Sequence, residues 1–253
     1  MPHRAWNRFG YPDRRGVFPL PQTQRFLDSL PPAESESILT HCSRVTFQTG
    51  QVLFDVGDEI RNVYLPLSCV VSLMTELRDG RHVESASVGQ EGIAGLPALV
   101  GGAISHNHVV VQVAGEALQL SVSDARRLAE TDCPAFHAHI GQLVNATMTA
   151  MAQSAACLAM HPVVERCARW LLSTSERVKR HQFHLTQEAL AAMLGVHRPS
   201  VTIACQTLQK AGLIRYHRGD IEVANREGLL AASCECYGVI RDLFDSFLGD
   251  GWA

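Results

Sequence analysis

The stretch LTQEALAAMLGVHRPSVTIACQTLQKAGLI, which runs from Leu185 to Ile214, has the spacing of two short helices joined by a tight turn. Gly195 stands at the turn, where the backbone needs a positive φ that glycine adopts without steric cost. Ala191, a small residue, precedes it by four positions, where the two helices would cross. The apolar residues that would pack the helices together are Leu190, Leu194, Val196, Val201 and Leu208. This combination favours a helix-turn-helix that reads DNA over a generic helical hairpin.

The residues directly after this stretch predict a β-hairpin. In LIRYHRGDIEVAN, residues 213–225, two β-rich runs flank a turn centred on Gly219. A hairpin in this place is the wing of a winged-helix domain. Arg215, His217 and Arg218 are placed to contact phosphates, which position a protein on DNA without specifying sequence.

The second helix is expected to have one face for its own core and one for DNA. The face predicted to turn inward consists of Val201, Ala204, Cys205 and Leu208. The candidate DNA contacts are Arg198, Ser200, Thr202, Ile203, Gln206 and Lys210. Among these we expect Arg198, Thr202 and Gln206 to read base edges. Ile203 can offer only an apolar contact, for instance to a thymine methyl. Pro199 is expected to hold Arg198 in an extended, pre-helical conformation.

Charge is distributed unevenly along the chain. The whole sequence is slightly acidic, with 22 Lys and Arg against 25 Asp and Glu. Residues 161–226, however, contain 10 basic and 5 acidic side chains, whereas residues 227–253 contain Arg241 alone against 5 acidic ones. The positive charge therefore coincides with the two-helix motif, and a local basic face is what contact with phosphates requires.

Residues 23–132 are interpreted as one β-structured domain. Short runs rich in β-branched residues alternate with glycine-containing turns, and Asp79-Gly80 between two such runs is a strong hairpin signal. A short helical segment precedes the runs, and another is expected at 123–132. The pattern predicts a small antiparallel barrel or sandwich. Residues 1–22 contain four prolines and four arginines without apolar periodicity, which is typical of a flexible, solvated arm.

A long helix is predicted for residues 133–160, with Pro134 in its first turn. Its apolar stripe is narrow and rich in small residues: Phe136, Ile140, Leu143, Val144, Thr147, Met151, Ala155 and Leu158. A helix of roughly 40 Å exceeds what a small barrel can cover, so the stripe is interpreted as the seam of a homodimer. Residues 161–253 are assigned to the DNA-binding domain. The predicted fold class is α+β, with an N-terminal antiparallel β-roll or jelly-roll sensor domain, a long dimerisation helix and a C-terminal winged helix-turn-helix.

Other functional classes find little support. No run approaches the ~20 apolar residues of a membrane span, and the N-terminus lacks the apolar stretch of a secretory signal, so we expect a cytoplasmic protein. No P-loop, dinucleotide fingerprint or Ser/His/Asp order appears, and no enzymatic activity is predicted. The eight cysteines are expected to be reduced core residues. Only Cys234 and Cys236 are close in sequence, and one C-x-C lacks the second pair that a zinc site needs, so no metal is predicted.

A β-roll, a long helix and a winged helix in this order resemble the Crp/Fnr family of bacterial transcription regulators over residues 23–230. The resemblance is strongest over Leu185–Ile214 and extends to FQTGQVLFDVGD (47–58) and VGQEGIAGLPALVGG (88–102). It implies a homodimer that binds a two-fold-related site in double-stranded DNA, with one reading helix per half-site and RNA polymerase as a further partner. Family readers usually place Arg, Glu and Arg at the positions of Arg198, Pro199 and Ile203. Only the first matches, so we expect the usual family consensus to be bound poorly.

The sensor domain departs from the family pattern at its ligand site. Members that bind cyclic nucleotides carry Gly-Glu and, about ten residues later, Arg-Ser or Arg-Thr, whose arginine neutralises the phosphate. Glu91 matches the Glu, but no Arg or Lys stands between Arg81 and Arg126. Ser105 and His106 occupy the region of the missing arginine. We therefore expect no binding of cyclic AMP in the usual mode. Glu91, Ser105 and His106 are the candidate effector contacts, and the cofactor is unknown.

Two alternatives stay open. His106-x-His108 with Glu116 resembles the metal site of a cupin barrel, since alternating strand residues share the face that a metal needs. The carboxylate lies further from the second histidine than is usual in cupins. The other alternative is a regulator of the same family with an unorthodox nucleotide ligand. Iron–sulfur sensing has no support, because no cysteine precedes Cys42.

Overall fold

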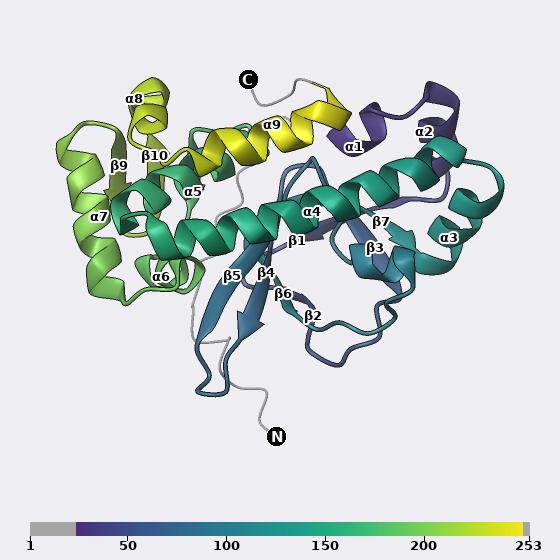
Figure 1. Cartoon of the computed structure of the whole chain (residues 1–253), viewed down its shortest axis with the longest axis horizontal. Helices are drawn as coiled ribbons and strands as arrows, with labels where there is room; N and C mark the ends of the chain where they lie inside the picture. Colours follow the sequence, from purple (N-terminus) through teal and green to yellow (C-terminus); the bar gives the residue numbers. More distant parts are fainter. Residues whose placement is uncertain (1–23, 250–253) are drawn as a thin grey trace.

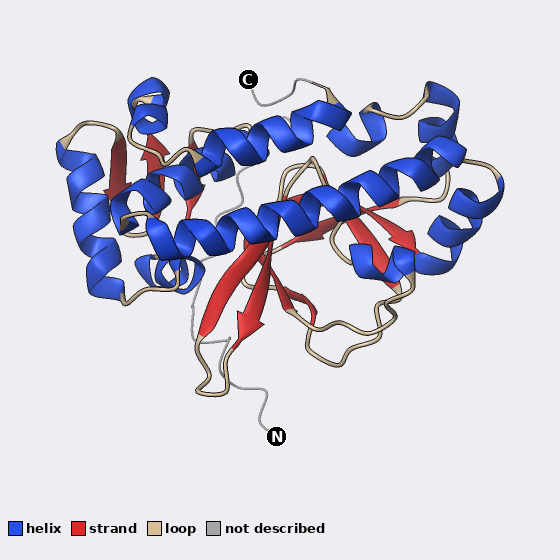
Figure 2. Ribbon diagram, in the orientation of Figure 1, coloured by secondary structure: helices blue, strands red, loops and turns tan. Residues whose placement is uncertain are grey.

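The computed structural model describes residues 24–249 (Figure 1). In chain order its elements are α1 (Arg25–Asp28), α2 (Pro32–Leu39), β1 (Ser43–Phe47), β2 (Val52–Phe54), β3 (Asn62–Pro66), β4 (Val70–Glu76), β5 (His82–Val88), η2 (Leu96–Val100), β6 (His108–Val113), β7 (Gly115–Ser121), α3 (Val122–Thr131), α4 (Pro134–Met160), α5 (Val163–Val178), β8 (Gln182–His184), α6 (Gln187–Leu194), α7 (Arg198–Lys210), β9 (Ile214–His217), β10 (Asp220–Val223), α8 (Arg226–Ala231) and α9 (Cys236–Leu248). The predicted arm, residues 1–22, lies outside the described residues. Antiparallel sheets, a long helix and a helix-rich C-terminal part confirm the predicted α+β fold class (Figure 2).

Two antiparallel sheets form the sensor domain. Their strand orders are β1-β7-β3 and β2-β6-β4-β5. Strands β4 and β5 form the hairpin predicted from Asp79-Gly80, with pairing that runs from Val71 opposite Val88 to Glu76 opposite His82. Side chains of the strands point inward, and one cluster of them includes Phe47, Phe54, Val71 and Val111.

Helix α4 crosses the molecule from one end to the other and has two different faces (Figure 1). Glu34 caps its start by accepting hydrogen bonds from the backbone N–H groups of Ala135 and Phe136, at 3.2 and 2.9 Å. Phe136, Ile140 and Leu143 are buried in the sensor core, at 1, 4 and 1 % exposure. The prediction that these three belong to a seam between two copies is therefore wrong, because they pack on their own chain. The exposed face lies beside them: Gly141, Asn145, Met148, Ala152, Ala155, Ala156 and Ala159.

The apolar composition of α4 is out of proportion to its burial. By length and composition alone, α4 is long and apolar enough to cross a membrane. No segment with this property was expected from the sequence. Only 22 % of its most apolar window is buried within this chain. An exposed apolar surface of this extent is typical of a side that another molecule covers.

Helices α5 to α8 and a small sheet of order β8-β10-β9 form the C-terminal domain. Cys167, Leu171, Leu190 and Val201 meet in its core. Strands β9 and β10 pair antiparallel as the predicted wing. The guanidinium of Arg166 donates to the carbonyl oxygen of Leu194 at 2.8 Å and so satisfies a backbone acceptor at the end of α6. The winged helix-turn-helix is therefore confirmed.

The last helix, α9, returns from the winged helix to the sensor domain. It lies beside α4 and ends near α1 (Figure 1). Ile240 and Phe244 are buried in the same core as Phe136 and Leu143. Residues 236–248 fall within the range predicted for the DNA-binding domain, yet they pack chiefly against the sensor.

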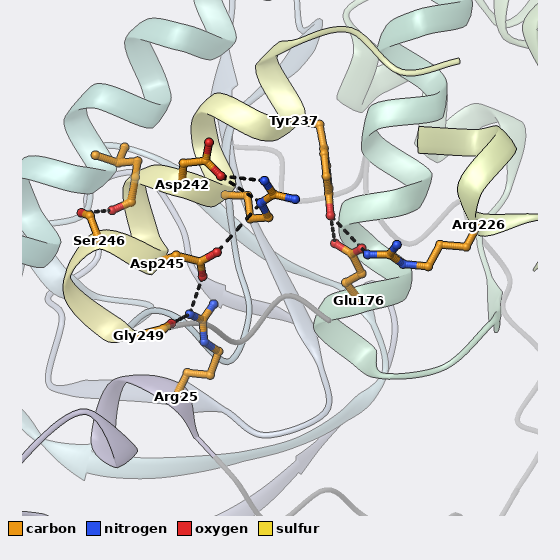
Figure 3. Close-up of polar contacts among 10 residues, drawn as sticks. Arg25, Glu176, Arg226, Tyr237, Asp242, Asp245, Ser246 and Gly249 are labelled. Atoms are coloured by element: carbon orange, nitrogen blue, oxygen red, sulfur yellow. Dashed lines mark hydrogen bonds and ion pairs between the residues drawn. The ribbon is translucent and has the colours of Figure 1, made fainter. Parts of the chain in front are cut away.

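Polar contacts hold both ends of α9 (Figure 3). Near its start, the Tyr237 hydroxyl donates to the Glu176 carboxylate at 2.6 and 2.7 Å, and Arg226 bonds the same carboxylate at 2.7 Å. Near its end, Arg25 forms an ion pair with Asp245 at 2.7 Å. These contacts connect α9 to the winged helix at one end and to the sensor at the other.

Candidate functional site

Residues at its two ends define helix α6 and its turn to α7. Thr186 caps α6 by accepting from the backbone N–H of Ala189 at 3.2 Å. Gly195 ends the helix with φ of +61°, in the left-handed region that glycine adopts most easily. A Cβ at this position would also lie 3.0 Å from Val83 of the β4–β5 hairpin, so Gly195 allows α6 to approach the sensor.

Helix α7 presents the face that was predicted for it. The four predicted inward residues are all buried, and Ile203, directly before Ala204, keeps 63 % of its surface exposed. Arg198, Gln206 and Lys210 are exposed, whereas Ser200 and Thr202 are half-buried. The Thr202 hydroxyl donates to the Gln187 side-chain oxygen at 2.7 Å, so it is engaged with α6.

One detail of the start of α7 differs from the prediction. Arg198 is the first helical residue, and the extended residue is His197, with φ of −73° and ψ of 145°. The expectation that Pro199 holds Arg198 extended is wrong by one residue. Proline is favourable in the first turn of a helix because the N–H group that it lacks has no intrahelical partner there.

The wing carries its basic residues on the surface. Arg218 has φ of +50° and Gly219 φ of +92°, which closes the tight turn between β9 and β10. Arg215, His217 and Arg218 are exposed. Arg215 is paired with Glu222 at 2.6 Å. Together with α7, the wing gives the domain a polar and basic outer side suited to the backbone and grooves of a duplex.

A cavity of about 250 Å³ lies between the sensor and the winged helix. It is lined by parts of β4, β5, η2, α4, α5 and α9. Its walls combine apolar side chains, among them Leu96, Met151, Ile240 and Phe244, with four charged ones: Glu84, Glu91, Arg169 and Arg177. An apolar pocket with a few converging polar groups has the form of a small-molecule site.

Glu91 and Arg177 form a buried ion pair across the two domains. Their Oε1 and Nε atoms are 2.7 Å apart, at 2 and 8 % residue exposure. Arg177 also donates to Ser87 of β5 at 2.6 Å, and Glu91 accepts from the backbone N–H of Gly89 at 3.2 Å. A Cβ on Gly89 would lie 2.6 Å from the Arg177 side chain, so glycine leaves the room that the arginine needs.

Glu84 makes a second link across the same boundary. Its carboxylate accepts hydrogen bonds from the Trp170 indole N–H of α5, at 2.9 Å, and from the Ser72 hydroxyl of β4. Burial of the carboxyl group raises the pKa of Glu84, and these hydrogen bonds offset only part of that effect. Both carboxylates of the cavity therefore contact α5, the first helix of the DNA-binding domain.

The other candidate effector residues lie elsewhere. Ser105 is buried and donates to the carbonyl oxygen of Asn107 at 2.8 Å, and His106 is exposed; neither lines the cavity. His108 is buried, with its Nδ1 3.1 Å from Asp55, while Glu116 pairs with Arg44 at 3.0 Å. The two histidines and Glu116 therefore do not form the cupin-like constellation.

Sequence reasoning missed the cationic side of the cavity. Arg169 and Arg177 belong to α5, about 80 residues after Glu91 in the chain. The family pattern places the cation in the segment that follows Glu91, and the arginines of α5 lie outside that segment. A usable signal was the presence of three arginines, Arg166, Arg169 and Arg177, on an amphipathic helix.

Two family models match the chain. The model described as a cyclic nucleotide-binding domain matches residues 44–132, and the one described as a Crp-like helix-turn-helix domain matches residues 165–232. No curated protein sequence matches.

Several solved structures share the fold. CLP from Xanthomonas campestris, whose structure is described as that of a c-di-GMP responsive global regulator, is 20 % identical, with a TM-score of 0.61 over 76 % of this chain and 99 % of that one. FixK2 from Bradyrhizobium japonicum is 16 % identical, with a TM-score of 0.65 over 76 and 98 %. A transcriptional regulator of the CRP/FNR family from Thermus thermophilus is 23 % identical, with a TM-score of 0.60 over 76 and 98 %. At these identities the likeness shows a common fold.

Proposed function

Since the chain belongs to the Crp/Fnr family and is a DNA-binding transcription regulator with a sensor domain, we propose that it works as a homodimer. In this proposal each copy places α7 in one half of a two-fold-related DNA site, and the cavity between the domains holds the effector. The observation that carries the proposal is the exposed polar face of α7 beside a basic wing.

The exposed face of α4 supports the homodimer. Its exposed residues recur every three or four positions: Gly141, Asn145, Met148 and Ala152. Ala159 follows seven positions later, and the exposed Ala155 and Ala156 lie between. This is the spacing of a coiled-coil seam, and its small side chains allow two helices to approach closely. The proposed seam shares only Ala155 with the stripe expected from sequence and faces solvent instead of the sensor core.

A charge in this seam tests the dimer. Ala152→Glu should convert the dimer to a monomer in sedimentation equilibrium, because two carboxylates would face each other across the axis. Gln142→Glu adds the same charge at the edge of the exposed face and should leave the dimer intact. A monomeric unmodified chain, or equal behaviour of the two variants, would contradict the seam.

DNA contacts are assigned to α7 and the wing. Arg198 and Gln206 are exposed and are proposed to read bases, with Thr202 held against Gln187 at the edge of the same face. Ile203 would offer an apolar contact. Ser200, Lys210 and the wing residues Arg215, His217 and Arg218 would contact phosphates.

The effector is proposed to act on the pair of Glu91 and Arg177. Glu91 lines the cavity and its partner belongs to α5, so a ligand that separates the two would loosen the winged helix from the sensor. Cyclic AMP in the usual mode is not the proposed ligand, because the cassette lacks its arginine. Arg126, the next arginine in sequence, donates to the carbonyl oxygen of Ala98 at 2.6 and 2.8 Å.

Family regulators of this kind are generally not enzymes, and we assign no catalytic residues. We further propose a cytoplasmic location, where DNA and RNA polymerase are accessible to the dimer.

Selection of bound sites from random DNA tests the central proposal. The full-length chain should enrich a two-fold-symmetric consensus whose half-sites lie about one helical turn, 10–10.5 bp, apart. Repeating the selection with cell extract would reveal an effector as a change in affinity. Absence of DNA binding at every salt concentration below ~0.1 M would contradict the proposal, since phosphate contacts strengthen as salt falls.

A further inference from the structure

Four potential metal ligands converge where α4 ends and α9 begins. Cys157 lies in the last turn of α4, His161 follows that helix directly, and Cys234 and Cys236 flank the start of α9. One ligand atom from each residue lies within 4.8 Å of the other three. All four residues are buried or half-buried, and the three cysteines are free thiols.

The distances fit one tetrahedral ion. The sulfurs of Cys157 and Cys234 are 3.5 Å apart, and the sulfur of Cys236 is 3.5 Å from Nδ1 of His161. With Zn–S bonds of about 2.3 Å and Zn–N bonds of about 2.0 Å, tetrahedral geometry places two sulfurs about 3.8 Å apart and a sulfur and nitrogen about 3.5 Å apart. An iron–sulfur cluster would hold its ligands further apart, because several atoms must fit between them.

We propose that Cys157, His161, Cys234 and Cys236 form a structural Zn²⁺ site. Three cysteines and one histidine are a ligand set typical of closed zinc sites. With all four positions filled by protein, the ion would stabilise the fold and would have no open position for catalysis. The proposal concerns the fold of the chain and does not depend on the DNA sequence or effector that it recognises.

Neighbouring groups complete the surroundings that such a site needs. Gln153 donates from Nε2 to the Cys236 sulfur at 3.0 Å. On the other side of the His161 ring, Nε2 lies 3.7 Å from the Glu235 carboxylate, which can orient the ring so that Nδ1 faces the ion. Arg169 lies near enough to favour thiolate at Cys157 and at Cys234, and it would balance part of the negative charge of three thiolates.

The protonation of the cysteines is consistent with metal binding. A hydrogen bond with Cys234 lowers the pKa of Cys157, and Arg169 and His161 act in the same direction. Burial raises the pKa of Cys236, and the hydrogen bond to Cys157 raises that of Cys234. Each thiol that binds Zn²⁺ does so as a thiolate and releases its proton to solvent.

The ion would fasten α9 to the junction between the domains. Cys157 and His161 bracket the end of α4, just before α5 begins, and the other two ligands precede or begin α9. The contacts of Tyr237 with Glu176 and of Asp245 with Arg25 hold the same helix further along (Figure 3). Zn²⁺ would add a third fastening at the point where the two domains meet.

Metal content of the purified full-length protein tests the site. After incubation with Zn²⁺ and removal of the free metal, we expect one Zn²⁺ per chain by inductively coupled plasma mass spectrometry. Cys157→Ser and Cys234→Ser should each lose the bound metal. Cys42→Ser, which removes a half-buried thiol outside the cluster, should retain it. His161→Cys should also retain it, whereas His161→Ala should weaken it, which separates ligation from general damage to the fold.

Two further measurements use the unmodified chain. Co²⁺ in place of Zn²⁺ should give the visible bands of tetrahedral thiolate coordination, and these should be absent in Cys157→Ser. Removal of Zn²⁺ by a chelator should lower the Tm by roughly 5 °C or more. A metal-free protein after Zn²⁺ incubation, equal zinc in Cys42→Ser and Cys157→Ser, an iron–sulfur chromophore, or a Cys157–Cys234 disulfide in the freshly purified protein would each overturn the proposal.

Discussion

The reading surface and the sensor cavity are built in opposite ways. The reading surface comes almost entirely from one continuous stretch, with α6, its turn and α7 within Gln187–Lys210. The cavity draws its walls from β4, β5, η2, α4, α5 and α9, which extend over most of the chain. A surface made by one stretch depends on helix periodicity and a single turn, whereas a cavity made by six elements depends on how the domains pack. The two should therefore respond differently to substitution.

The largest effect is expected where the cavity depends on one pair of distant residues. Arg177→Ala leaves Glu91 buried without its partner, which should lower the free energy of unfolding by about 3–5 kcal/mol. Urea denaturation measures this loss. Arg61→Ala, which breaks an exposed ion pair with Glu59, should cost less than about 0.5 kcal/mol.

A double variant makes this test sharper. Replacing both partners, as in E91Q/R177M, removes the unpaired charge and should recover much of the loss. If Arg177→Ala costs no more than Arg61→Ala, the pair does not hold the domains together, and the cavity does not depend on distant residues more than the reading surface does.

Substitutions on the reading surface should change affinity for DNA and leave folding intact. Gln206→Ala should remove about 1–3 kcal/mol of discrimination at one base pair per half-site, because Gln206 is exposed and makes no contact that the fold needs. Arg218→Ala should instead weaken all sequences alike and reduce the salt slope of binding by about 1. Titrations of matched and mismatched sites at several salt concentrations separate the two. Gln209→Ala, the same change on the same helix, is the control. An equal loss of discrimination in Gln209→Ala would mean that Gln206 is not a base-reading residue.

The cavity should also be sensitive to pH. Because the folded state raises the pKa of Glu84, it binds the proton more tightly than the unfolded chain does. The stabilising contribution is complete below the ordinary pKa near 4.5 and is lost as pH rises through the raised value in the folded protein. Glu84→Gln keeps an acceptor for Trp170 and should remove this dependence, which amounts to at most about 1.4 kcal/mol per pH unit.

Urea midpoints measured from about pH 5 to 8 test this. As the pH rises, the midpoint of the unmodified chain should fall relative to that of Glu84→Gln. Glu130→Gln, on the exposed side of α3, should run parallel to the unmodified chain. Parallel curves for Glu84→Gln as well would mean that the carboxyl group is better solvated than its position indicates.

The smallest effect is expected at His106. Its side chain is exposed and outside the cavity, so His106→Ala should change the free energy of unfolding by less than about 0.5 kcal/mol and leave any response to an effector unchanged. His108→Ala, two residues away, removes a buried ring that contacts Asp55 and should cost about 1–3 kcal/mol. If the effector response depends on His106, the effector does not bind in the cavity as proposed.

The sequence allowed the local features to be predicted and failed where distant segments meet. Gly195 at a positive φ, the buried face of α7 and the Asp79-Gly80 hairpin each follow from patterns within a few residues, and the structure has all three. The assignment of Phe136, Ile140 and Leu143 to a seam was wrong, because periodicity shows that a helix has an apolar face but not which neighbour covers it.

The same limit applies to the clusters around α9. Nothing in the spacing of Cys234 and Cys236 indicates that Cys157 and His161 lie beside them, some 75 residues earlier in the chain. The partner of Glu91 was equally hidden, because Arg177 belongs to the other domain. Both arrangements arise from packing between domains, which single-sequence patterns do not encode.

The position of α9 has a consequence for biosynthesis. Among the described elements it is the last to leave the ribosome, yet Ile240 and Phe244 complete the core of a domain whose strands are translated first. The sensor therefore cannot close its apolar surface until α9 has been translated. Its final folding step waits for the C-terminal helix, and until then the side of α4 that this helix covers is open to chaperones or to aggregation.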